Sequence, residues 1–241
     1  MSTVQLRPIQ DPQQLHQRSL LKFYHLIAML FVVLFLITNI IAQKIVPLGT
    51  KLVLTAGDFV YPLMYFVSML LTEVYGYALS RQVIWSAFIN NLLMVLIITL
   101  AIQLPAADCW QQQAAFATVL GAAPRLWLAS LAAFLFGEFI GTYLLAKIKI
   151  LTQGRYLWLR TFSATLIGQL IDSLIFTVIA FYGIHSWENV LLLSGAAYGC
   201  KLFYQLLLTP LSYPVVNFLK QQENLDIFDH HTRFNPLKFW R

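Results

Sequence analysis

The chain has very little charge. Only 11% of its 241 residues are Asp, Glu, Lys or Arg, whereas 59% are hydrophobic. A soluble domain carries about 25% charged residues, because that share is needed to cover a surface that faces water. A chain with so few charges cannot face water on all sides, which excludes an ordinary soluble domain and favours an integral membrane protein.

Residues that mark several kinds of catalysis are also scarce. The two cysteines, Cys109 and Cys200, lie too far apart for a metal-ligand or redox spacing. His230 and His231 stand beside acidic residues, but nothing fixes a coordination geometry, and we interpret this segment as a solvated tail. The sequence contains no nucleotide-binding loop, HExxH zinc motif or GxSxG nucleophile elbow. We therefore expect no metal, no cofactor and no enzyme activity.

Six apolar segments are each long enough to cross a bilayer. About 20 apolar residues span the hydrocarbon core as a helix, and a strand exposed to lipid would leave its backbone groups unpaired. The predicted helices run over residues 23–43, 59–79, 83–104, 126–146, 159–183 and 190–219. The predicted fold class is thus an all-α integral membrane protein with six transmembrane helices, preceded by a polar, poorly ordered leader at 1–22 and followed by a tail at 220–241.

Two local features refine this layout. The second and third segments are separated only by a short stretch around Arg81, which predicts a tight helical hairpin there. Pro210 and Pro214 lie in the last third of the long sixth segment, and proline removes a helical hydrogen bond. The sixth helix should therefore kink at these prolines or leave the membrane early.

The basic residues predict the orientation. If the N-terminus is cytoplasmic, twelve of the sixteen Lys and Arg residues fall on the cytoplasmic side and three on the other, while Lys201 lies inside a helix. Such a bias sets the orientation of membrane proteins, so we expect both termini to be cytoplasmic. It also accounts for the net charge of +6 without any binding of nucleic acid.

Four charged residues fall inside the predicted helices: Glu73, Glu138, Asp172 and Lys201. Each costs about 2.5–3.5 kcal/mol near the middle of a membrane helix, so residues of this kind are candidates for function. They could instead neutralise one another and hold the bundle together. One lysine cannot pair fully with three acids, however, so at least one carboxylate should serve a solute or a proton.

The fifth segment carries a polar stripe. Thr161, Thr165, Gln169 and Asp172 recur at helical spacing on one arc, and Ser173 lies at its edge. A polar stripe on a membrane helix must face protein or a water-filled cavity. Interhelical hydrogen bonding explains the threonines well. It explains the glutamine beside an aspartate less well, and we expect these two to line a site.

Small residues predict where helices approach closely. Gly137 and Gly141 flank Glu138, and Gly168 lies on the polar stripe. A second pair of glycines, Gly195 and Gly199, precedes Lys201. The adjacency of both pairs to charged residues indicates that the charged cluster lies at a packed helix junction.

Tyrosines near the charged residues are candidates for stacking on a flat solute. Tyr75 and Tyr77 follow Glu73, and Tyr198 and Tyr204 flank Lys201. An aromatic ring can stack while its hydroxyl finds a polar partner. Packing remains the alternative role for each of them.

At these same positions the sequence resembles the queuosine precursor transporter family. The matching motifs, in chain order, are TEVYGY at Thr72–Tyr77, SATLIGQLIDSLIF at Ser163–Phe176, Lys201 with Thr209–Pro210, and DIFDHHTRFNP at Asp226–Pro236. The resemblance implies a multi-pass protein of the bacterial inner membrane. It also implies an importer of 7-cyano- or 7-aminomethyl-7-deazaguanine, the precursors of a modified tRNA nucleoside.

With that substrate class, the polar residues take definite roles. A deazaguanine presents adjacent N–H donors that one carboxylate can accept together. We expect Asp172 or Glu138 to accept them, Gln169 to orient the base, and Lys201 to keep the empty site neutral. The full predicted substrate-binding set is Glu73, Tyr75, Glu138, Gln169, Asp172, Ser173, Tyr198 and Lys201.

Two other functional classes compete with a transporter. A substrate-capture subunit would bind the solute but need a separate ATPase module, and transport by the purified chain would exclude it. A membrane enzyme would need a nucleophile or metal set, which the sequence does not offer. Energy coupling stays open between facilitated diffusion, a proton carried by Glu73 or Glu138, and dependence on a partner. No pattern reveals the oligomeric state. The expected partners are a small-molecule substrate and membrane lipid.

Overall fold

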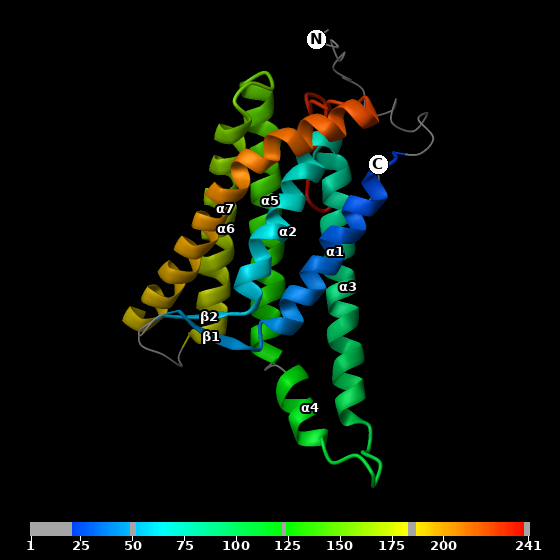
Figure 1. Ribbon diagram of the computed structural model, residues 1–241, viewed down its shortest axis with the longest axis vertical. Helices are drawn as coiled ribbons and strands as arrows, with labels where there is room; N and C mark the ends of the chain where they lie inside the picture. The colour runs from blue at the N-terminus through cyan, green and yellow to red at the C-terminus, as the bar shows by residue number, and fades with distance from the viewer. Residues whose placement is uncertain (1–20, 49–51, 122–123, 183–186, 239–241) are drawn as a thin grey trace.

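The computed structural model describes residues 21–48, 52–121, 124–182 and 187–238, and most of them lie in long helices (Figure 1). The elements are, in order, α1 Tyr24–Ile41, β1 Ile45–Leu48, β2 Leu52–Thr55, α2 Gly57–Tyr75, α3 Tyr77–Gln103, α4 Gln113–Leu120, α5 Pro124–Leu151, α6 Leu157–Phe181 and α7 Trp187–Glu223.

Within the described residues, five helical stretches are long and apolar enough to cross a membrane. They are Tyr24–Ile41, Gly57–Gln103, Gln113–Leu151, Leu157–Ala180 and Tyr198–Glu223. Large apolar side chains such as Leu92 and Leu96 point outward from them, about half exposed, as lipid-facing residues do. This mostly helical architecture agrees with the predicted membrane class.

The stretch Gly57–Gln103 contains two helices, α2 and α3, that run in opposite directions in Figure 1. The chain reverses at Gly76 rather than around Arg81, where the sequence analysis expected the turn. Gly76 has φ +80°, and a Cβ there would lie 2.8 Å from Cγ2 of Ile227. Glycine therefore permits both the backbone conformation and the close approach. The sequence analysis extended the second helix to residue 79 because the residues on both sides of Gly76 are apolar. Hydrophobicity alone therefore gave no sign of a turn at this glycine.

Three short elements were not predicted: the two strands of a hairpin and one helix. Strands β1 and β2 form an antiparallel hairpin in which Ile45 pairs with Thr55 and Leu48 with Leu52. Helix α4 is a short helix of eight residues between α3 and α5. The all-α prediction thus needs a small correction, because four-residue strands are too short to stand out between membrane-length segments. We call the end of the bundle at β1 and β2 the hairpin end.

Helix α7 continues past both prolines. It runs for 37 residues, with Pro210 and Pro214 inside it. In Figure 1 it rises along the bundle and then turns to lie across the opposite end from the hairpin. The change of direction agrees with the predicted kink, since proline cannot donate a helical hydrogen bond and its ring crowds the preceding turn.

The segment after α7 packs against the bundle, which corrects its interpretation as a solvated tail. Asp229 is buried, and its Oδ2 accepts a hydrogen bond of 3.0 Å from the backbone N–H of Tyr77. Arg81 Nη1 donates to the carbonyls of Arg233 and Asn235 at 3.1 and 2.8 Å. Residues 225–238 therefore close over the turn between α2 and α3, and we call this the tail end of the bundle. His230 and His231, by contrast, are exposed.

Helices α5 and α6 cross at glycines. A Cβ at Gly137 would lie 2.8 Å from Asp172 Cβ, and one at Gly168 would lie 3.0 Å from the Gly137 carbonyl oxygen. The predicted close contact is therefore present at Gly137, Gly141 and Gly168. The prediction was wrong for the second pair, because a Cβ at Gly195 or Gly199 would meet no atom within 4 Å in the described part of the chain.

This contrast gives a matched test of packing. Gly168→Ala should destabilise the protein by about 1–3 kcal/mol, because the added methyl meets the backbone of α5, which cannot move aside freely. Gly199→Ala adds the same methyl at an exposed helical position and should cause no loss of stability. Thermal unfolding in detergent measures both. Equal melting temperatures for the two variants would contradict close packing at Gly168.

Candidate functional site

Asp172 lies at the centre of a polar cluster formed by three helices. Its Oδ2 accepts a hydrogen bond of 3.0 Å from Lys201 Nζ on α7, and its Oδ1 accepts one of 2.8 Å from Tyr61 Oη on α2. The Lys201 ammonium also lies 4.3 Å from the centroid of the Tyr61 ring, within the range of a cation–π contact. Asp172 is 4% exposed and Lys201 8%. We call Tyr61, Asp172 and Lys201 the Asp172 cluster.

A cavity of about 460 Å³ reaches this cluster from the hairpin end. Its volume is within the range of small-molecule sites in proteins. Its polar lining residues are Thr38, Asn39, Gln43, Thr55, Asp58, Tyr61, Ser130, Asp172, Ser173, Thr177, Ser194 and Lys201. Aromatic and aliphatic side chains, Trp127 and Phe176 among them, supply the rest of the wall. Most of the exposed area of this wall is nevertheless apolar, and an apolar wall with polar groups at fixed positions suits a small organic solute.

The cluster offers an acceptor and a donor side by side. The Asp172 carboxylate accepts one hydrogen bond on each oxygen and keeps further lone pairs. Lys201 carries three N–H donors, of which Asp172 takes one. Because the two charges balance, the cluster can stay buried without a net charge, and a neutral polar solute can bind without leaving a charge unpaired.

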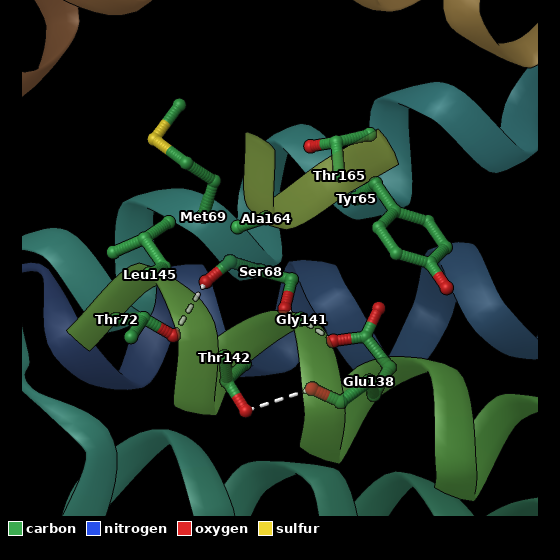
Figure 2. A pocket seen from close by; sticks show the side chains of 10 residues that line it. All are labelled: Tyr65, Ser68, Met69, Thr72, Glu138, Gly141, Thr142, Leu145, Ala164 and Thr165. Atoms are coloured by element: carbon green, nitrogen blue, oxygen red, sulfur yellow. Dashed lines mark hydrogen bonds between the residues drawn. The ribbon is translucent and has the colours of Figure 1, made fainter. Parts of the chain in front are cut away.

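Glu138, on α5, lies beside a second and much smaller cavity of about 20 Å³ (Figure 2). Ser68 Oγ donates a hydrogen bond to Glu138 Oε2, whereas Oε1 of the same carboxylate has no partner among the described residues. Tyr65, Thr72, Thr142 and Thr165 add further oxygens to the lining.

Glu73 does not join either site. Its carboxylate is fully buried and receives a paired contact from Arg160, whose Nε and Nη2 each lie 2.8 Å from one of its oxygens. Lys220 Nζ lies 2.6 Å from Glu73 Oε1, and Lys149 Nζ donates to the Glu73 carbonyl at 2.6 Å. Both lysines also pair with Asp226 at 2.8 Å.

These five residues, the Glu73 network, tie α2, α5, α6, α7 and the following segment together at the tail end. Glu73 and Tyr61 are twelve residues apart on α2, which corresponds to about 18 Å of helix axis at 1.5 Å per residue. The structure therefore separates Glu73 from the Asp172 cluster.

The other predicted residues have different surroundings. Ser173 lines the large cavity beside Asp172, whereas Gln169 is buried one turn away and lines neither cavity. Tyr198 Oη donates to the carbonyl of Leu166 at 3.0 Å, and Tyr75 Oη donates to Glu223 at 2.9 Å. The hydroxyls of both tyrosines thus form helix-to-helix contacts.

Sequence reasoning missed the residues that α2 contributes. Tyr61, Tyr65, Ser68 and Thr72 follow one another at spacings of four, three and four, so they share one face of the helix. This stripe meets Asp172 at one end and Glu138 further along. The same periodicity argument that singled out the fifth segment would have found it.

The chain is similar to a known protein family and to a curated relative. The model of the family described as "Putative vitamin uptake transporter" matches residues 55–215. A curated relative, the "Probable queuosine precursor transporter" of Bacillus subtilis (strain 168), is 31% identical over 170 residues, which cover 70% of this chain and 74% of the relative. No solved structure matches the chain.

Proposed function

This chain belongs to the family of queuosine precursor transporters, and we propose that it imports 7-cyano- or 7-aminomethyl-7-deazaguanine across the bacterial inner membrane. It is a transporter rather than an enzyme, as its family indicates. The observation that carries the proposed substrate is the cavity of about 460 Å³ that ends on the Asp172 cluster. The curated relative bears the name of this substrate class.

The chemistry of the base fits the cluster. The pairing edge of a deazaguanine carries two neighbouring N–H groups followed by a ring carbonyl. In our proposal, the Asp172 carboxylate accepts the two N–H groups, and Lys201 donates to the carbonyl. Tyr61 lines the cavity and offers a ring for stacking. We assign these contacts to Asp172 rather than Glu138 because Asp172 lines the large cavity.

We further propose six transmembrane helices with both termini cytoplasmic. Helices α1, α2, α3, α5, α6 and α7 supply the six crossings. The tail end gathers Arg81, Lys147, Lys149, Arg160 and Lys220, whereas Lys44 and Arg125 lie toward the hairpin end. This distribution supports a cytoplasmic tail end, because cytoplasmic ends of membrane helices carry the excess of Lys and Arg. The large cavity then faces the periplasm, from which an importer takes its substrate.

Uptake by the purified chain tests this function. Reconstituted in liposomes without any partner, the protein should take up labelled 7-cyano-7-deazaguanine saturably, and unlabelled base should compete. Protein-free liposomes and labelled adenine, which presents a different pairing edge, serve as controls. Tight binding without uptake would instead indicate a capture subunit that depends on a separate ATPase. If the folded protein shows no binding and no uptake of this base, the proposed substrate is excluded.

A further inference from the structure

Of the three carboxylates that the sequence singled out within the membrane helices, Glu138 is the one that has no ion pair with a basic side chain in the described part of the chain. It is 1% exposed, and its hydrogen-bonding side-chain neighbour is the Ser68 hydroxyl. Asp172 is paired with Lys201, and Glu73 with three basic side chains. Within the described residues, no Lys or Arg forms an ion pair with Glu138. The described residues therefore provide no counter-charge for the Glu138 carboxylate.

A buried carboxylate in this position requires a cation from outside. Removing an unpaired charge from water costs several kcal/mol, so the group must bind a cation or a proton to remain buried. The cavity beside Glu138 measures about 20 Å³, close to the space of a single water molecule. It excludes any organic cation. Oε1, which has no partner in the described part of the chain, is the atom open to protonation.

The helices that line this small cavity, α2, α5 and α6, supply hydroxyl groups to it and no basic side chain among the described residues. From α2 come Tyr65, Ser68 and Thr72, and from α6 comes Thr165. The nearest second acid is Asp172 on α6, and Lys201 of α7 already balances its charge. Of the three carboxylates that the sequence singled out, Glu138 is thus the one whose charge can change without breaking an ion pair.

The two sites lie side by side around Gly137. A Cβ on that glycine would lie 2.9 Å from Tyr65 Oη and 2.8 Å from Asp172 Cβ, and Glu138 is the next residue on α5. The Tyr65 ring packs against the Tyr61 ring with centroids 5.2 Å apart, and Tyr61 donates to Asp172. A change of charge at Glu138 therefore acts on the Asp172 cluster through direct neighbours.

We propose that Glu138 binds and releases the proton that couples substrate import to the proton gradient. This inference rests on the proposed function, because a coupling site has meaning only in a transporter. Protonation at the periplasmic side would neutralise the carboxylate while substrate occupies the Asp172 cluster. Release of the proton to the cytoplasm would then accompany release of the substrate.

Two transport modes in liposomes separate coupling from transport itself. In the wild-type protein, an inward proton gradient should drive accumulation of labelled 7-cyano-7-deazaguanine, and a pH-sensitive dye should report protons entering with the substrate. Glu138→Gln cannot exchange a proton. It should lose gradient-driven accumulation and proton entry but retain counterflow, in which unlabelled internal base exchanges with labelled external base at equal pH.

The controls distinguish proton coupling at Glu138 from transport of the base itself. Glu138→Asp restores a titratable carboxyl and should recover coupling, and melting temperatures in detergent show that each variant is folded. Gradient-driven accumulation by Glu138→Gln, accumulation driven by sodium instead of protons, or absence of proton entry in the wild type would each overturn the assignment. Wild-type protein without counterflow would contradict the proposed function instead.

Discussion

Asp172→Asn should weaken binding of the 7-deazaguanine by at least about 10- to 100-fold, which corresponds to roughly 1.5–3 kcal/mol for a lost hydrogen bond to a charged group. The amide keeps the shape of the side chain but replaces one acceptor oxygen with a donor. Two N–H groups of the base then meet a group that cannot accept both. Equilibrium binding of labelled base to purified protein in detergent measures the loss, and uptake in liposomes should fall with it.

The same substitution leaves Lys201 without its counter-charge, so its effect on stability must be separated from its effect on binding. Removing one partner of a buried ion pair is commonly more costly than removing both. Asp172→Asn combined with Lys201→Met should therefore recover much of the stability of the protein while binding stays lost. Recovery of binding in the double variant would show that Asp172 serves only to neutralise Lys201 and does not itself contact the base.

A second acid in the same cavity provides the matched control. Asp58 also lines the cavity wall, but its Oδ2 already accepts from the backbone N–H and the hydroxyl of Thr55. Asp58→Asn makes the same chemical change and should leave affinity within about threefold of the wild type, as expected for a group that contacts no substrate. If both asparagine variants lose binding equally, the base is not held at the Asp172 cluster.

Part of this site could be predicted because membrane helices obey strong local rules. The polar stripe of the fifth segment is buried as expected, with Thr161, Thr165, Gln169 and Asp172 all facing protein. The small residues on α5 and α6 indicated where the helices cross. Both features depend on the spacing of residues within one helix, which the sequence displays directly.

The sequence does not show which charged side chains on different helices form ion pairs. The sequence offered Glu73, Glu138 and Asp172 as partners for one lysine, but it could not show that Lys149, Arg160 and Lys220 reach Glu73. Those three basic residues lie near helix ends, where they were assigned to the cytoplasmic surface. Their long side chains instead reach the buried Glu73 carboxylate, and only the three-dimensional arrangement shows which acid they meet.

The packing of residues 225–238 was hidden for a similar reason. The segment is short and polar in composition, which is typical of solvated tails. Its buried positions, Leu225, Ile227 and Asp229, alternate along an irregular chain and give no helical pattern. They become buried because Gly76 and Gly154 leave room against the bundle: a Cβ at Gly154 would lie 2.9 Å from the Phe228 ring.

Glu73→Gln should destabilise the protein by about 3–5 kcal/mol, because it leaves Arg160, Lys149 and Lys220 close together with Asp226 as the remaining acid. Lys147→Gln, at a lysine that lies over the Phe234 ring, is the control for loss of one charge at the tail end and should cost about 1 kcal/mol or less. Thermal unfolding in detergent compares the two variants.

The same variant decides between two roles for Glu73. If its carboxylate only fixes the helices, Glu73→Gln protein that is kept folded at low temperature should bind the 7-deazaguanine with wild-type affinity, since the network lies about 18 Å along α2 from Tyr61. Adding Lys220→Met should restore part of the lost stability, because it removes one of the three cations that would otherwise be left with Asp226 as their remaining acid. A normal melting temperature together with lost binding would instead place Glu73 in the substrate site, as the sequence alone suggested.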